Sequence, residues 1–122
     1  MNQNQLGVFI GTLMQSRNQA HIYHLQTESF AGHTALQAYY EGIIPLIDGV
    51  VESYQGRYGI LRGYNMAASI KEDGNPETYF EALCKFVETA RFQIPQDSYI
   101  QNQIDEIVSL IESTKYKLKF LH

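Results

Sequence analysis

Nonpolar residues recur every three or four positions along most of this chain, which is the spacing of the buried face of an α-helix. Four segments carry the pattern. Their inward faces are Leu6, Phe9, Ile10, Leu13, Arg17, Ala20, His21 and His24; Leu36, Tyr40, Ile44, Ile47, Val51 and Tyr54; Phe80, Leu83, Val87 and Ala90; and Ile100, Ile104, Ile107, Ile111 and Leu118. No segment alternates convincingly as a half-buried strand does. The sequence therefore predicts four helices.

Residues typical of helix starts delimit three of these segments. Ser29 is a candidate N-cap for the second helix. The third has the clearest signal, because Asn75 can cap and Pro76 then occupies the first helical position, which proline favours. The fourth starts after a cap at Asp97 or Ser98. These signals separate the helices by two short loops and one long connection.

The loop lengths predict the topology. Short loops make two antiparallel hairpins, and the glycine-rich stretch between them is long enough to cross the bundle, with room for a short turn of helix within residues 58–70. Pro45 interrupts the second segment, but the nonpolar stripe keeps its phase across it, which favours one kinked helix over two. We therefore expect an all-α fold, a ferritin-like four-helix bundle with a longer crossover between helices 2 and 3, in a single domain of residues 1–122.

Composition narrows the class of protein. The 122 residues are 44% hydrophobic and 18% charged, which is typical of a globular domain. No nonpolar run approaches the roughly 18 residues of a membrane helix, and the first residues lack the pattern of a secretory signal. The lone Cys84, expected in the core or at its margin, fits a reducing compartment, so we expect a cytoplasmic protein. With a net charge of −4 and Lys115, Lys117 and Lys119 spread around a helix, we expect neither nucleic-acid nor membrane binding.

Histidines and carboxylates gather on the first two helices. His21 and His33 are equally far from residue 27, where the first hairpin should turn, so we expect them level with each other and facing one site. On the second helix, one edge of the stripe carries His33, Gln37, Glu41, Asp48 and Glu52. Imidazole and carboxylate together are ligands of iron, manganese or zinc. The sequence therefore offers a candidate metal site.

The two halves of this site lie too far apart in one chain. From His33 to Asp48 a helix rises about 22 Å, at about 1.5 Å per residue, so both cannot bind one ion. Two copies of the second helix packed antiparallel about a two-fold axis near residue 41 bring them together and create two equivalent sites. We therefore expect a homo-oligomer that assembles through the second helix and is at least a dimer.

The spacing of these residues resembles a known family. The run His21-Ile-Tyr-His-Leu-Gln-Thr-Glu-Ser-Phe-Ala-Gly-His33, followed by Asp48 and Glu52, is similar to the Dps-type mini-ferritins, the DNA-binding proteins from starved cells. In that family the histidines of one subunit and the Asp-x-x-x-Glu pair of its two-fold mate form a site where iron(II) is oxidised. The resemblance covers the first two helices and implies a small, divergent member of the kind that phages encode. It implies His21, His33, Asp48 and Glu52 as iron ligands of a ferroxidase.

Several positions depart from the family pattern. Gln37 stands where the family has an acidic residue, so a second iron is held poorly and the expected ferroxidase activity is weak. Glu41, one turn along the same edge, can substitute for the missing acid. Ile22 replaces the usual tryptophan, and the lysine-rich tail that binds DNA is missing. His24 has no place in the match, so we expect it to be structural or solvent-facing.

A second hypothesis needs no metal. The same histidines and carboxylates can form a polar seam of hydrogen bonds across a dimer interface. The protein is then a non-catalytic helical bundle with a structural or interaction role. The sequence leaves both hypotheses open, and it does not choose iron over manganese or zinc.

Overall fold

The computed structural model describes residues 3–66, 70–71 and 74–122. It contains four long helices, α1 (Gln3–Gln26), α2 (Phe30–Tyr58), α3 (Pro76–Ala90) and α4 (Ser98–Phe120), with a 3₁₀ turn, η1 (Arg91–Gln93), after α3. No strand occurs in these residues. The all-α, four-helix bundle predicted from the sequence is confirmed. No helix within the described ranges is long and nonpolar enough to cross a membrane.

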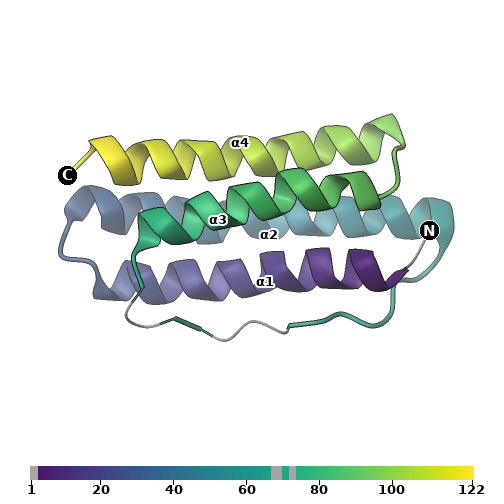
Figure 1. Ribbon diagram of the computed structural model, residues 1–122, viewed down its shortest axis with the longest axis horizontal. Coiled ribbons are helices and arrows are strands. Elements are labelled where there is room, and N and C mark those ends of the chain that lie inside the picture. The colour runs from purple at the N-terminus through teal and green to yellow at the C-terminus, as the bar shows by residue number, and fades with distance from the viewer. Residues whose placement is uncertain (1–2, 67–69, 72–73) are drawn as a thin grey trace.

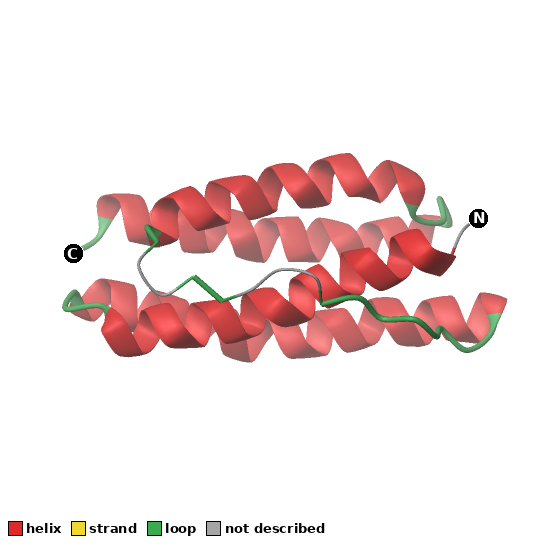
Figure 2. Cartoon of the chain, turned by 60° about the horizontal axis from the view of Figure 1, so that its bottom comes forward, coloured by secondary structure: helices red, strands yellow, loops and turns green. Residues whose placement is uncertain are grey.

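The helices form two antiparallel hairpins joined by one long crossover (Figure 1). α1 and α2 make the first hairpin, and α3 and α4 make the second. The crossover leaves the end of α2, returns along α1 over most of the length of the bundle and enters α3, so that α2 and α3 run in the same direction (Figures 1 and 2). The predicted longer connection between helices 2 and 3 is therefore present.

Local capping explains where the helices begin. The Ser29 hydroxyl accepts a hydrogen bond from the backbone N–H of Gly32, at 3.0 Å. The Asn75 side chain accepts from the N–H of Glu77 at 2.8 Å, and Pro76 follows as the first helical residue. Asp97 occupies the N-cap position of α4, although its carboxylate makes no capping bond and accepts instead from the Tyr58 hydroxyl.

The buried stripe of α2 differs from the sequence prediction. The core side of α2 is formed by Tyr39, Ile43 and Val50, whereas Ile44 is 44% exposed. Each buried residue has a chemically equivalent neighbour, since the sequence reads Tyr-Tyr, Ile-Ile and Val-Val at these three places. The nonpolar pattern therefore fits two phases of the helix equally well. Leu36, Ile47 and Tyr54 belong to both phases and are buried as predicted. At the three doublets the second residue was predicted to be buried, whereas the structure buries the first.

Contacts with the neighbouring helices explain the observed phase. The Tyr39 hydroxyl is hydrogen-bonded to the Ser16 hydroxyl of α1, 2.7 Å away in the core. Burial raises the pKa of Tyr39 far above its usual value, so this hydroxyl stays protonated. On the side facing α4, a Cβ added to Gly42 would lie 3.4 Å from the Leu110 side chain. The rotation leaves the polar edge of α2 pointing away from the bundle.

Pro45 lies within one continuous helix. It is on the exposed side of α2, where solvent can bind the carbonyl that loses its helical partner. The expectation of one helix over two is therefore confirmed.

The crossover packs tightly on α1. A Cβ at Gly7 would overlap the Gly63 carbonyl, and a Cβ at Gly11 would overlap the Asn65 carbonyl. The Asn65 N–H donates to the Gly7 carbonyl at 3.2 Å, and Leu61 is buried. Residues 59–66 and 70–71 contain no helix, so the short turn suggested for residues 58–70 is absent from the described part of that segment, and residues 67–69 lie outside it.

Candidate functional site

His24 of α1 and His33 of α2 link the two helices of the first hairpin through a reciprocal contact, which we call the clasp. Their rings are stacked with centroids 3.6 Å apart. Nδ1 of His24 lies 2.7 Å from the His33 carbonyl oxygen, and Nδ1 of His33 lies 2.9 Å from the His24 carbonyl oxygen. Because a carbonyl only accepts, each ring carries a proton on Nδ1, and in the neutral ring Nε2 keeps its lone pair. His24 is buried, so of the two expected alternatives, structural or solvent-facing, it is the structural one.

This clasp changes the predicted register of the hairpin. The residue level with His33 is His24, and not His21. The pairing of residues 24 and 33 puts the centre of the hairpin between residues 28 and 29 rather than at residue 27. The loop occupies residues 27–29, and α2 begins at Phe30. His21 is three residues further along α1, about 4.5 Å at about 1.5 Å per residue. The prediction that His21 and His33 are level is therefore wrong by about one helical turn.

His21 has different partners. Its ring stacks on Tyr40 with centroids 4.4 Å apart, and its centroid is 6.0 Å from that of His24. Nη1 of Arg17 lies 3.2 Å from His21 Nδ1, and the same guanidinium lies 5.1 Å from the Tyr40 ring centroid. Because arginine only donates, Nδ1 of His21 accepts this bond, and the neutral ring carries its proton on Nε2. The two histidines predicted as equivalent ligands are thus in opposite tautomers.

Arg17 and Tyr40 were not among the site residues predicted from the sequence. One signal was available for Arg17, since residues four apart are neighbours on a helix surface and Arg17 precedes His21 by four. No comparable signal existed for the reciprocal contact of His24 and His33, because it depends on the length of the loop.

The acidic half of the predicted site lies on the outer face of α2. Gln37, Glu41, Asp48 and Glu52 are all exposed. The Gln37 amide donates to the Glu41 carboxylate at 2.7 Å, so the residue at the family's acidic position is bonded to the residue expected to substitute for the missing acid. Among the described residues, neither Asp48 nor Glu52 has an ion-pair partner. A shallow hollow between α1 and α2 is lined by Arg17, Ile44, Asp48 and three other residues.

A single copy of the chain does not assemble these residues around one point. Within the described ranges, no group of three or more histidine, cysteine, aspartate or glutamate side chains is placed to hold a metal ion. The structure brings His24 and His33 together, and Gln37 and Glu41. It leaves Asp48 and Glu52 on the open face of the same helix as His33.

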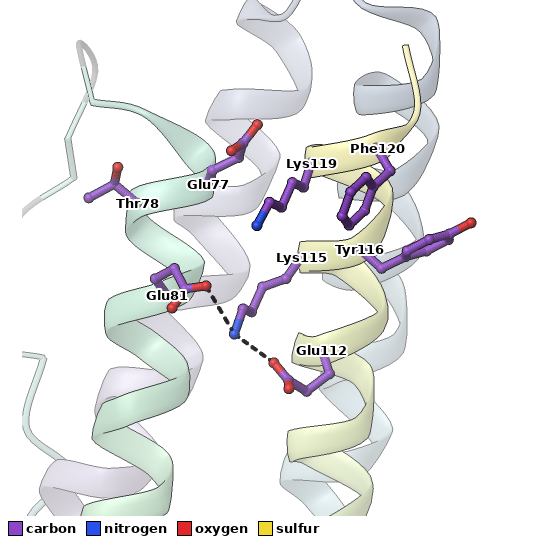
Figure 3. Close-up of a pocket in the computed structure, with 8 residues that line it drawn as sticks. All are labelled: Glu77, Thr78, Glu81, Glu112, Lys115, Tyr116, Lys119 and Phe120. Atoms are coloured by element: carbon purple, nitrogen blue, oxygen red, sulfur yellow. Dashed lines mark ion pairs between the residues drawn. The ribbon is translucent and has the colours of Figure 1, made fainter.

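A second polar cluster lies in a groove of about 480 Å³ between α3 and α4 (Figure 3). Lys115 Nζ bridges the carboxylates of Glu112 at 2.7 Å and Glu81 at 3.2 Å. The bond from Lys115 lowers the pKa of Glu112, and Glu112 in turn raises the pKa of Lys115. The Cys84 thiol donates to Glu112 at 3.6 Å, and burial raises the pKa of that thiol. The charged side chains of Lys115, Glu81 and Glu112 are therefore paired with one another.

Comparison with known proteins identifies the family. A family of unknown function, DUF5856, matches residues 24–118. The chain belongs to this family. The matched region includes His33, Asp48 and Glu52 and begins three residues after His21. No curated protein and no solved structure matches the chain significantly.

Proposed function

We propose that the protein forms a two-fold dimer through the outer face of α2 and binds iron(II) at the seam, as a Dps-like protein with weak ferroxidase activity. In this arrangement His33, joined by His21, comes from one subunit, and Asp48 and Glu52 come from its mate. One observation carries the proposal. The observed rotation of α2 exposes the whole polar edge from Gln37 to Glu52, where a second copy can reach it.

The numbering of this face is self-complementary. His33 and Asp48 are equally far from the point between residues 40 and 41. Two α2 helices packed antiparallel about that point therefore place His33 opposite Asp48 of the partner subunit, and the symmetry repeats the contact. The same register sets Ile44, which is 44% exposed, near the axis and opposite Gln37 of the partner subunit. The centre of the interface then contains Ile44 together with the Gln37–Glu41 pair, and one His33–Asp48 site lies on each side of it.

The donor set suits iron(II) as a substrate. A neutral imidazole that donates its other N–H to a backbone carbonyl is the usual arrangement of a metal-binding histidine, and His33 has it. Two carboxylates supply the hard oxygen ligands that stabilise iron(III) once oxygen or peroxide has taken an electron. Bundles with one long crossover include the ferritin-like folds, which supports the same reading.

Native mass spectrometry after anaerobic loading with iron(II) tests this proposal, because one spectrum reports both the number of subunits and the metal content. We expect an even-numbered oligomer with one or two irons per subunit. His33→Ala and Asp48→Asn should each abolish iron binding while the helical content is retained. Glu88→Gln, at an exposed carboxylate of α3, is the matched control and should bind iron as the wild type does. A metal-free oligomer would exclude the iron site.

The second candidate is a polar dimer seam with no metal. The hydrogen bonds from Arg17 to His21 and from Gln37 to Glu41 favour it, because they satisfy these groups without an ion. In that case His21→Gln and Asp48→Asn should weaken dimerisation, and no metal ion should change the melting temperature. Sedimentation of both variants with and without iron(II) separates the two candidates.

A further inference from the structure

We propose that Arg17 restrains His21 and thereby limits the metal affinity of the site. This inference rests on the proposed function, and it assigns a regulatory role to a residue outside the ligand set. It predicts that His33 and the carboxylates of the partner subunit bind the ion first. His21 joins only after Arg17 has moved away.

The hydrogen bond between Arg17 and His21 blocks both nitrogens of the ring. Ligation through Nδ1 requires the lone pair that now accepts from Nη1, 3.2 Å away. Ligation through Nε2 requires the ring proton to move to Nδ1, where it would face the N–H of the guanidinium. Since arginine has no acceptor atom and stays protonated, it cannot adapt to either state. Both routes to ligation therefore require Arg17 to leave.

Other contacts hold Arg17 in this position. Its guanidinium lies 5.1 Å from the Tyr40 ring centroid, and Nη1 also donates to the Asn18 side chain at 3.2 Å. Tyr40 is shared, because His21 stacks on the same ring. The side chain of Arg17 is half-buried, so its charge is less screened than that of a fully exposed arginine. A divalent cation bound at His21 would be repelled by this charge.

His33 lacks such a restraint. Its Nδ1 donates to a backbone carbonyl, and the lone pair of the neutral ring is on Nε2. No lysine or arginine within the described residues is hydrogen-bonded to this ring. The contrast between the two rings is what orders the binding of the ligands.

Two variants test the role of Arg17 in metal binding. Arg17→Met keeps a long side chain against Tyr40 and removes both the charge and the hydrogen-bond donor. The affinity for iron(II), measured by anaerobic titration, should rise about tenfold, which is a typical effect of residues that hydrogen-bond to metal ligands. Arg62→Met, at an exposed arginine of the crossover, is the matched control and should leave the affinity unchanged. Melting temperatures check that both variants are folded.

A measurement on the metal-free protein keeps this inference separate from the proposed function. Nitrogen-15 spectra of the imidazoles should show the proton of His21 on Nε2 and the protons of His24 and His33 on Nδ1. Arg17→Met should release His21 from its tautomer and leave the other two unchanged. Equal iron affinity in the wild type and Arg17→Met would overturn the role of Arg17 while the proposed function stands. Absence of iron from both proteins would overturn both.

Discussion

The two hairpins of this bundle differ in the ion pairs of their charged side chains. In the α3–α4 hairpin, Lys115 is paired with Glu81 and Glu112, and Arg91 is paired with Asp105 at 2.6 Å. In the α1–α2 hairpin, the seam is made of stacked histidine and tyrosine rings, and Asp48 and Glu52 remain on the outside without an ion-pair partner among the described residues. Asp48 and Glu52 share their helix with His33, and this combination of imidazole and unpaired carboxylates makes the first hairpin the better candidate for function.

The crossover adds to this difference. It lies along α1 and packs its backbone against Gly7 and Gly11, so the first hairpin is covered on its α1 side and open on its α2 side. The outer face of α2 is therefore accessible, as the proposed dimer requires.

The largest expected effect concerns the phase of α2. Ile43→Ala removes a fully buried side chain and should lower the free energy of unfolding by about 2–5 kcal/mol. Ile44→Ala, the same change one residue later on the open face, should cost less than about 1 kcal/mol in the monomer. Urea denaturation of the two variants measures the difference. If Ile44→Ala proved the more costly, the outer face of α2 would be wrongly assigned.

A smaller effect is expected where the crossover meets α1. Gly11→Ala places a Cβ against the Asn65 carbonyl and should destabilise the fold by about 1–3 kcal/mol, as overpacking does. Gly56→Ala, in α2 with open space around the added Cβ, is the control and should stabilise it by about 0.5–1 kcal/mol. Thermal unfolding of both variants provides the comparison, and equal melting temperatures would contradict the close packing of the crossover.

The smallest effect concerns the ion pairs of the second hairpin. The pKa of Glu112 is below its ordinary value in the folded protein, so its pair with Lys115 stabilises the fold at neutral pH and is lost as the pH falls below about 4.5. In Glu112→Gln the free energy of unfolding should therefore fall less steeply as the pH is lowered. At neutral pH this variant should lose at most about 0.5 kcal/mol of that free energy, because the pair is largely exposed. Lys115→Met should reduce the pH dependence similarly. Denaturation midpoints measured across this pH range would show an unchanged slope if the pair contributed nothing.

Much of the fold could be predicted because its signals are local. Asn75 and Pro76 start α3 through bonds and a backbone angle that involve only their neighbours, and they do so in the structure. The isoleucines of α4 repeat at helical spacing with polar residues between them, so only one face could be buried. The long crossover was predicted from the number of residues between the second and third helices.

The candidate site was less predictable, because it depends on loop length and on a choice between equivalent residues. A shift of the loop centre by one to two residues paired His33 with His24 instead of His21. The residue doublets of α2 allowed two phases, and the interpretation from sequence took Ile44 as core. The role of the four predicted ligands in metal binding stays a prediction, since it requires a second copy of the chain.

The sequence by itself determined the number of helices, the starts of three of them and the presence of a crossover, since these depend on interactions between residues close in the chain. Only the tertiary structure decided which face of α2 is open, which histidine lies opposite His33, and which nitrogen of the His24 and His33 rings keeps its lone pair. These features depend on contacts between α1 and α2, namely that of Ser16 with Tyr39 and those of the His24 and His33 rings with backbone carbonyls. They also depend on the length of the loop that joins the two helices. A pattern of residue types along one helix does not contain that information.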